Sequence, residues 1–235
     1  MGRHFEVRAA SMAATAAKKS AVYMRASKEI YMAAKSGIPN PESNLALRSA
    51  IEKYRKECPR DVIDRAIKKA QGGDSESYIA GRYEAFGPAG SLLIIDTLSD
   101  NVNRALVDVR TAVTRHGGHL GNVLYNFSLY GIFDFKGDEA LKSKVEETLV
   151  LNDINVQEIS FEDGYIEVLV SPEDFDKARE QLNGIGINEF DNAQVTLLAN
   201  ERIILEGEEL NKFKDLLDAL DDVSDVQAVY HNVNL

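Results

Sequence analysis

Hydrophobic and polar positions divide the chain into a helical first third and a mixed remainder. Before residue 71, apolar residues recur at the three-to-four-residue spacing of helices in three stretches. Gly37 ends the first stretch, Asn40-Pro41 is expected to cap and open the second helix, and Pro59 begins the third. The pattern therefore predicts a small helical domain, followed by a linker at residues 71–74.

The stretch from residue 81 to 121 has the most distinctive order of residues. Two short runs typical of strands flank Gly87-Pro88-Ala89-Gly90, which predicts a hairpin turn. The side-chain oxygens of Ser99-Asp100-Asn101 can cap a helix, and the apolar residues from Val102 onward form one helical face. Gly117-Gly118 should end this helix, because glycine adopts the left-handed conformation at little cost. The stretch thus predicts strand, turn, strand, helix and a glycine-rich exit.

Beyond residue 121 the pattern alternates again between strand and helix. Residues 123–127 and 131–135 predict strand pieces around a turn, and a helix is expected from about 138 to 151. The alternating runs on either side of Asp163-Gly164 predict a β-hairpin. A helix opened by Pro172 and a strand over residues 190–198 follow. Residues 137–199 are therefore expected to fold as α-β-β-α-β.

The last segment predicts a helix around residues 210–220 and a strand over 226–233. One helix and one strand cannot build a core, so we expect them to complete the sheet begun by residues 79–136. The predicted fold class is α+β, with an N-terminal helical domain followed by two small ferredoxin-like α/β modules, the second inserted into the first. The expected domains are residues 1–78, residues 79–136 with 200–235, and residues 137–199.

Charge is strongly segregated along the sequence. The chain of 235 residues has a net charge of −11, yet residues 1–73 carry 15 Lys and Arg against 7 Asp and Glu. Residues 137–199 carry only 4 Lys and Arg against 15 Asp and Glu. A basic end on an acidic chain favours binding to a polyanion, with nucleic acid as the first candidate. The alternative, that these charges serve only solubility, stays open at this stage.

Lysine and arginine side chains bind phosphates without reading the base sequence. No helix shows a clear base-reading pattern, so we expect weak sequence preference. Asn103 and Arg104, at the start of the helix that follows residue 101, extend the expected basic surface. The predicted nucleic-acid-binding residues are Arg3, Arg8, Lys18, Lys19, Arg25, Lys28, Lys53, Arg55, Lys56, Arg60, Lys68, Lys69, Asn103 and Arg104.

The sequence shows no pattern of a familiar catalytic, cofactor or metal site. The turn at residues 87–90 lacks the Lys-Ser/Thr ending of a phosphate loop. Glycines separate His116 from His119, which leaves their geometry too loose for a predicted metal site. No nucleophile motif is present, and Cys58 is expected to be structural. We therefore predict a protein that is not an enzyme, with no catalytic residues, no cofactor and no metal.

Targeting signals are also missing from the pattern. No apolar run approaches the length of a membrane span, and the N-terminal stretch lacks the apolar core of a signal peptide. A single cysteine excludes an intramolecular disulfide and fits a reducing compartment. We expect a cytoplasmic protein that makes no contact with a membrane.

Several of these stretches together resemble one known family, the YebC-type proteins. The resemblance is carried by Gly2–Glu6 (GRHFE), residues 58–67 (CPRDVIDRAI), residues 82–90 (RYEAFGPAG), residues 100–121 (DNVNR, VR and GGHLG) and residues 226–232 (VQAVYHN). This family includes bacterial proteins labelled probable transcriptional regulators and a mitochondrial translational activator of cytochrome oxidase. The resemblance implies three domains and nucleic-acid binding.

Two stretches depart from the family pattern. Residues 9–16 are Ala-rich where members usually carry several Lys or Arg, and the run after Gly121 looks about two residues short. The favoured function is a DNA-binding transcriptional regulatory protein. One alternative is a ribosome-associated translation factor that binds ribosomal RNA, with the acidic modules facing basic proteins or solvent. The other is a protein-protein interaction module whose basic end binds an acidic partner.

Overall fold

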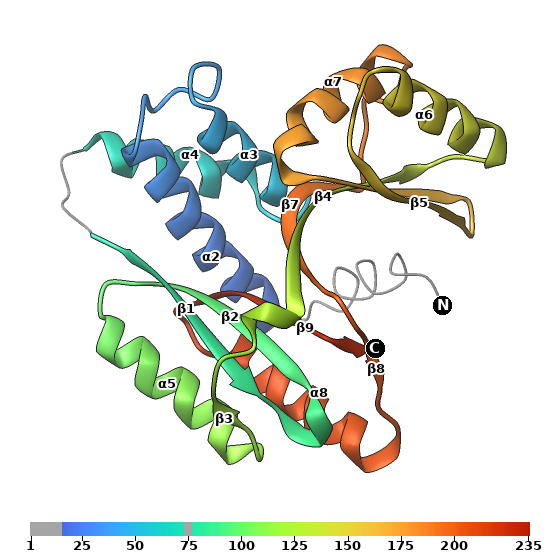
Figure 1. The fold of residues 1–235 in the computed structure, drawn as a ribbon. Coiled ribbons are helices and arrows are strands. Elements are labelled where there is room, and N and C mark those ends of the chain that lie inside the picture. The colour runs from blue at the N-terminus through green and yellow to red at the C-terminus, as the bar shows by residue number, and fades with distance from the viewer. Residues whose placement is uncertain (1–15, 73–76) are drawn as a thin grey trace. The chain divides into compact units, whose positions relative to one another are not determined.

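The computed structural model describes residues 16–72 and 77–235. These residues form two compact units, which we call the main unit (residues 16–126 and 199–235) and the inserted unit (residues 127–198). Figure 1 traces the path of the chain through both. Among the described residues, no helix is both long and apolar enough to cross a membrane.

Three helices open the main unit: α2 (Ala16–Lys35), α3 (Leu45–Tyr54) and α4 (Arg60–Gln71). They pack through small and branched side chains at helical spacing, and Ala26, Ile30 and Leu47 are fully buried. The predicted helices are confirmed in this part of the chain. Pro59 stands immediately before α4 as expected, because proline fits a position where no amide donor is needed.

The start of α3 differs from the prediction. Asn40 and Pro41 lie in a turn, in which the Asn40 side chain accepts from the backbone N–H of Glu42 at 3.0 Å. The helix is capped instead by Asn44, whose side-chain oxygen accepts from Leu47 N–H at 3.0 Å. The Asn44 amide also donates to the carbonyls of Ala33 and Ile38. These tertiary bonds decide the cap, and local sequence preference cannot reveal them.

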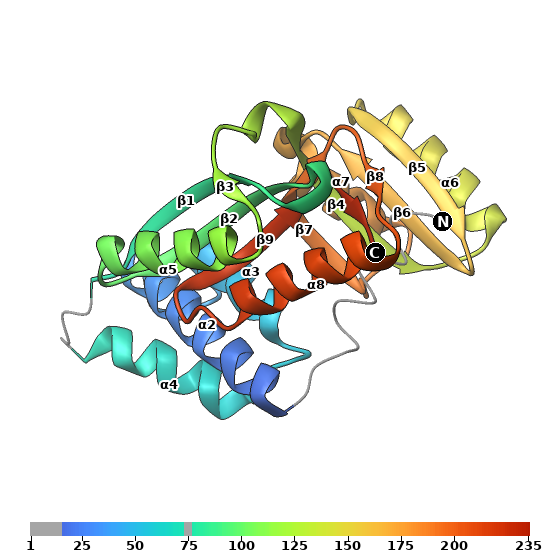
Figure 2. The same cartoon turned by 90° about the horizontal axis from the view of Figure 1, so that it is seen from below.

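A four-stranded antiparallel sheet forms the rest of the main unit, in the order β3-β1-β2-β9. Helices α5 and α8 cover one face of it, as Figure 2 shows. A short parallel pair, β8 with β10, joins the end of the chain to the segment before α8. The elements are β1 (Ile79–Phe86), η1 (Pro88–Gly90), β2 (Leu92–Ser99), α5 (Val102–Arg115), β3 (His119–Leu120), η2 (Leu124–Asn126), β8 (Ile203–Ile204), α8 (Gly207–Asp221), β9 (Val226–His231) and β10 (Val233–Asn234).

The last part of the chain completes this sheet, as predicted. β9 pairs with β2, which places Val229 opposite Ile95. Between sheet and helices lies a core that includes Leu93, Val109 and Phe213, none of which is exposed. Burying side chains of this size stabilises the fold by roughly 1.5–3 kcal/mol each. The expected hairpin at residues 87–90 is also present, closing β1 onto β2.

The inserted unit has a β-α-β-β-α-β chain order and a sheet in the order β5-β6-β4-β7. Helices α6 and α7 pack on one face of the sheet, over Phe133, Val168 and neighbouring residues. This chain order and strand order are those of a ferredoxin-like module. Its elements are β4 (Phe127–Lys136), α6 (Glu139–Leu151), β5 (Val156–Glu162), β6 (Tyr165–Val170), η3 (Pro172–Asp174), α7 (Phe175–Gly184) and β7 (Asn192–Ala199).

The boundary expected at residue 137 lies earlier, at residue 127. β4 pairs with β6 over residues 131–136 and contributes Phe133 and Phe135 to the inserted core. In the sequence, β4 is an apolar run that could belong to either of the two sheets. Its pairing with distant residues leaves no local pattern that would assign it to one of them. The run expected over residues 123–127 is also mostly a short 3₁₀ turn, since the Glu84 carboxylate accepts the N–H groups of Val123 and Leu124.

The hairpin at Asp163-Gly164 is confirmed. Both residues have positive φ angles, 50° for Asp163 and 79° for Gly164. Consecutive left-handed residues fit the right-handed twist of the flanking strands, and Asp-Gly tolerates that conformation best. The turn fixes the register that pairs Glu162 with Tyr165.

The revised boundary can be tested with two fragments. Residues 127–199 should fold alone and give a dispersed amide NMR spectrum with a cooperative thermal transition. Residues 137–199 lack β4, which occupies the position between β6 and β7, so they should give a collapsed spectrum and no cooperative transition. Equal behaviour of the two fragments would contradict the boundary at residue 127.

A second prediction concerns His231 on β9. Burial, aided by the charge of Arg202, lowers the pKa of His231 from 6.5 to about 4. The unfolded chain therefore takes up the proton first, so stability is full above pH 6.5 and falls between pH 6.5 and pH 4. Denaturant titrations should show a loss of about 2 kcal/mol between pH 7 and pH 5 that is missing in His231→Gln. The exposed His119→Gln serves as control and should keep the loss.

Candidate nucleic-acid interface

The apolar faces of α3 and α4 determine where their basic residues lie. Val62, Ile63 and Ala66 face the core of the helical region, so the intervening charged positions of α4 are exposed. Six of the predicted residues lie exposed on α3, on α4 or between them: Lys53, Arg55, Lys56, Arg60, Lys68 and Lys69. The structure therefore brings part of the predicted set together on one pair of helices.

Four other predicted residues lie near the beginning of the chain. Arg3 and Arg8 fall outside the described residues. Lys18 and Lys19 belong to α2, but their side chains are not among those described. The Ala-rich departure over residues 9–16 also lies almost wholly outside the described part. These positions stay predictions.

Arg55 and Lys68 make no ion pair with any carboxylate of the described residues. Other cations nearby do pair: Lys53 lies 2.9 Å from Glu29, and Arg60 lies 4.0 Å from Asp64. Exposed pairs of this kind contribute about 0–1 kcal/mol, so a phosphate can compete for their cations. Arg55 and Lys68 are the positions where a phosphate would displace no internal partner.

A second basic group surrounds Tyr31 of α2. The Lys35 ammonium donates to the Tyr31 hydroxyl at 3.1 Å, and the Lys69 ammonium lies 6.0 Å from the centre of the Tyr31 ring. Tyr31 is itself only 2% exposed, so it holds both lysines against a fixed ring. Lys35 was not in the predicted set. Its signal in the sequence is the four-residue spacing from Tyr31, which puts both on one helical face.

Three predicted residues, Arg25, Lys28 and Arg104, instead bind groups of the protein itself. Arg25 donates to the carbonyls of Asp221 and Val226 and forms an ion pair with Asp221 at 2.7 Å. These contacts join α2 to the turn between α8 and β9. They occupy the polar atoms that a phosphate would need.

Lys28 and Arg104 meet at the carboxylate of Asp225. Lys28 lies 2.9 Å from one oxygen of Asp225, and Arg104 lies 2.8 Å from the other. The Ser99 hydroxyl donates to the same carboxylate at 2.8 Å. Arg104 also forms an ion pair with Asp100 at 2.7 Å. We call these residues, with Arg25 and Asp221, the junction cluster.

Asp225 is almost wholly enclosed, with 2% of its side chain exposed. Burial alone would raise the pKa of Asp225, but the hydrogen bonds from Lys28, Arg104 and Ser99 outweigh burial and hold the pKa below its ordinary value. The carboxylate therefore stays ionised at neutral pH. The junction cluster links α2 to the sheet, while Asn103 remains exposed beside it at the start of α5.

Two further side chains of the helical region are structural. Tyr54 donates to Glu29 at 2.6 Å, and burial together with that carboxylate raises the pKa of Tyr54 well above its ordinary value. Burial raises the pKa of Cys58 to about 11, with a smaller effect from Glu57. A thiol of this pKa is protonated at neutral pH and is a poor nucleophile.

Comparison with known proteins gives a clear relationship. A family model described as the TACO1/YebC protein N-terminal domain matches residues 3–73, and a model described as the TACO1/YebC second and third domain matches residues 78–233. The chain belongs to the TACO1/YebC family. The two matches meet near residues 73–78, where the sequence predicts a linker.

Individual relatives extend along the full sequence. A protein of Mesoplasma florum, named as a probable transcriptional regulatory protein, is 43% identical over 239 residues, with 100% of both chains covered. The crystal structure of a conserved hypothetical protein from Aquifex aeolicus is 29% identical, with a TM-score of 0.76. That similarity covers 93% of this chain and 91% of the other. The fold of the family is therefore shared by this chain.

Within residues 16–72 and 77–235, no group of three or more His, Cys, Asp or Glu side chains is arranged to hold a metal ion. His116 and His119 lie at the exit of α5. His116 makes a 2.7 Å contact through Nδ1 with the carbonyl of Ala112, while the His119 ring packs on Phe86. The two imidazoles thus have separate environments.

The junction cluster leads to a test of stability. Asp225→Asn removes the charge that Lys28 and Arg104 share, and it should lower the free energy of unfolding by about 2 kcal/mol. The loss should be full at neutral pH and shrink as pH falls below 3.8, since the depressed pKa of Asp225 confers stability only where the carboxylate is ionised. The exposed Asp222→Asn should change stability by less than about 0.5 kcal/mol. Equal effects in urea titrations would contradict this role.

Proposed function

We propose that the protein is a nucleic-acid-binding regulatory protein that acts in transcription and binds phosphates through its helical region. The observation that carries the proposal is the exposed basic surface of α3 and α4 on a chain whose net charge is −11. We call it the helical basic surface and define it as Lys53, Arg55, Lys56, Arg60, Lys68 and Lys69. The name of the Mesoplasma florum relative, a probable transcriptional regulatory protein, supports the regulatory role.

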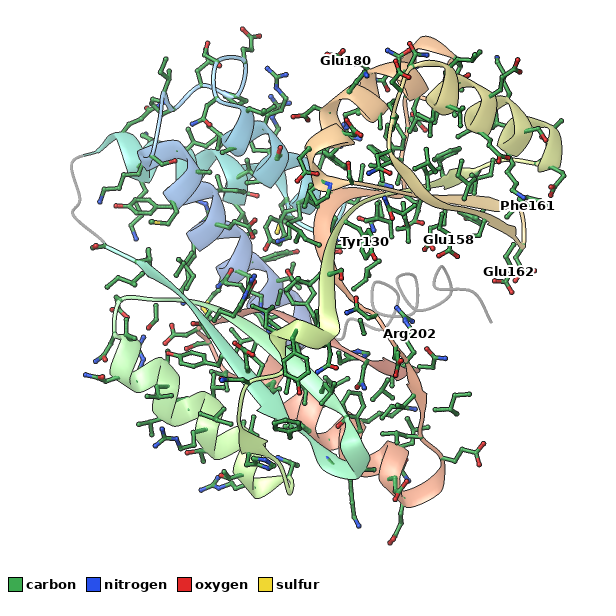
Figure 3. All side chains as sticks on the ribbon, in the orientation of Figure 1. Tyr130, Glu158, Phe161, Glu162, Glu180 and Arg202 are labelled. Carbon is green, nitrogen blue, oxygen red and sulfur yellow. The ribbon has the colours of Figure 1, made fainter. Side chains whose placement is uncertain are left out.

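The charge of the inserted unit supports binding through the helical region rather than through the inserted unit. Residues 127–198 carry 16 Asp and Glu against 5 Lys and Arg. Figure 3 labels exposed carboxylates among them, Glu158 and Glu162 on β5 and Glu180 on α7. A surface of this charge is repelled by phosphates at distances within about 10 Å at 0.1 M salt. Binding therefore concentrates on the helical region, while the inserted unit is suited to solvent or to basic proteins.

The same acidity favours one second candidate, a translation factor that binds ribosomal RNA. A ribosomal site would offer basic proteins to the inserted unit as well as phosphates to the helical basic surface. DNA without proteins would offer phosphates to the helical basic surface but no basic partner to the inserted unit. Both candidate functions use the same basic residues. A competition experiment between duplex DNA and ribosomal RNA therefore distinguishes them.

A charge-reversal variant tests the helical basic surface. Arg55→Glu with Lys68→Glu should weaken binding to a fluorescein-labelled 20-base-pair DNA about tenfold at 100 mM salt in anisotropy titrations. It should also reduce the slope of log K against log salt by about 1.8, because each lost phosphate contact contributes about 0.9. The matched control is Lys212→Glu with Lys214→Glu on α8, which applies the same charge change to two exposed lysines.

The control should bind within twofold of the unaltered protein. Equal binding by both double variants would contradict the proposed surface. Competition then distinguishes the candidates: unlabelled duplex DNA should displace the probe at least as well as an equal mass of ribosomal RNA if the role is transcriptional. Strong preference for ribosomal RNA would favour the translation factor instead.

A further inference from the structure

We infer that the exposed flanks of the C-terminal half of α5, together with β3 just beyond it, are a second contact site, for single-stranded nucleic acid. We call it the α5 surface and define it as Arg110, Arg115 and His119, with Phe86 beneath His119. The inference rests on the proposed function and deepens it, because it adds a site that can distinguish unpaired from paired strands. None of these residues belongs to the helical basic surface or to the junction cluster.

The two arginines are exposed and make no ion pair with any carboxylate among the described residues. Their neighbours differ. Arg82 is bound to Asp96 through two contacts of 2.6 and 2.8 Å, and Arg104 is held in the junction cluster. Within residues 77–126, Arg110 and Arg115 are therefore the arginines that remain available to an external anion.

Carboxylates of residues 77–126 are mostly occupied by the protein. Glu84 accepts two backbone N–H groups, Asp96 binds Arg82, and Asp100 binds Arg104. Asp108 is the remaining acidic residue of residues 77–126, and it is half-buried on α5. Counted within residues 77–126, two arginines are thus left over against one aspartate, on a chain that is acidic as a whole.

Favourable interaction with the helix dipole explains only one of these arginines. A cation in the last turn of a helix stabilises the carbonyl end by about 0.3–1 kcal/mol. Arg115 occupies that last turn, but Arg110 lies more than one turn earlier. Arg110 also faces outward in line with Asn103, Val107 and Thr114, which recur at helical spacing and are all exposed.

A stacked aromatic pair joins His119, just beyond the end of α5, to the half-buried Phe86 of β1. The rings of Phe86 and His119 are stacked, with centroids 5.0 Å apart and an interplanar angle of 17°. Phe86 supports one face of the imidazole, while His119 as a whole is exposed on β3. Proteins that bind single strands combine cations for the backbone with rings on which unpaired bases stack.

The glycine exit of α5 makes this arrangement possible. Gly117 has a φ angle of 81°, which turns the chain sharply after the helix. At Gly118 an added Cβ would overlap the Phe86 carbonyl oxygen, so only glycine allows β3 to approach β1 this closely. The close approach pairs His119 with Phe86 in the sheet and brings their rings together.

Anisotropy titrations of the full chain with a fluorescein-labelled single-stranded 20-mer and with its duplex test the site. Arg110→Glu with Arg115→Glu should weaken single-strand binding about tenfold and reduce the salt slope by about 1.4, which corresponds to two lost contacts at about 0.7 each. His119→Ala should weaken it about fivefold or more with an unchanged slope, because stacking involves no counterion release. His119→Tyr retains a ring and should bind within twofold.

Lys212→Glu with Lys214→Glu on the neighbouring helix α8 is the control and should bind the single strand within twofold of the unaltered protein. Duplex binding should fall less than twofold in His119→Ala, because paired bases are not available for stacking. If both α5 variants match the control on the single strand, the site is wrong even where Arg55→Glu with Lys68→Glu still weakens duplex binding. If only that helical variant has no effect, the proposed phosphate binding by the helical region is wrong while the α5 surface stands.

Discussion

The buried carboxylate of Asp225 is the interaction on which the main unit depends. This carboxylate forms ion pairs with Lys28 of α2 and Arg104 of α5, and it accepts a hydrogen bond from the Ser99 hydroxyl at the end of β2. An enclosed charge with fewer partners would destabilise the fold, because desolvation costs several kcal/mol. Each partner comes from a different part of the chain, so the helical region, the sheet and the α8–β9 turn must be correctly placed together. The exposed helical basic surface and the α5 surface are both built on that framework.

Much of the fold follows from local sequence. Asp163-Gly164, the repeat along α5 and the Gly117-Gly118 exit each act through conformational preferences of a few residues, and the structure has the expected elements there. The boundary of the inserted unit could not be found this way. β4 is an apolar run, and its assignment depends on pairing with β6, which lies about thirty residues later along the chain. Asn44 is missed as a cap for the same reason, since Ala33 and Ile38 determine its position.

The predicted basic residues fall into two groups, those whose cation is paired inside the protein and those whose cation is not. The sequence cannot distinguish the paired residues Arg25, Lys28 and Arg104 from the unpaired Arg55 and Lys68. It shows only that all five are basic and where they lie relative to the predicted helices. The partners of the paired residues, Asp221 and Asp225, lie near the other end of the chain, between the helix predicted around residues 210–220 and the strand predicted over 226–233. Only the fold shows that these opposite charges meet. Lys35 is the opposite case, because its partner is local. Tyr31 lies four residues earlier on the same helical face, a spacing that can be recognised in the sequence.

This division also explains how an acidic protein can present basic surfaces. Net charge controls long-range attraction, but binding depends on which cations remain after internal pairing. Residues 77–126 carry four acidic and four basic side chains. Three of the acids are bound to backbone N–H groups or to Arg82 and Arg104, so Arg110 and Arg115 are left over against Asp108 alone. In the junction cluster three carboxylates pair with three cations, so none of these cations is left over. The candidate binding surfaces of this chain are thus determined by which cations pair inside the protein. Much of the excess negative charge belongs to a different part of the sequence, the inserted unit.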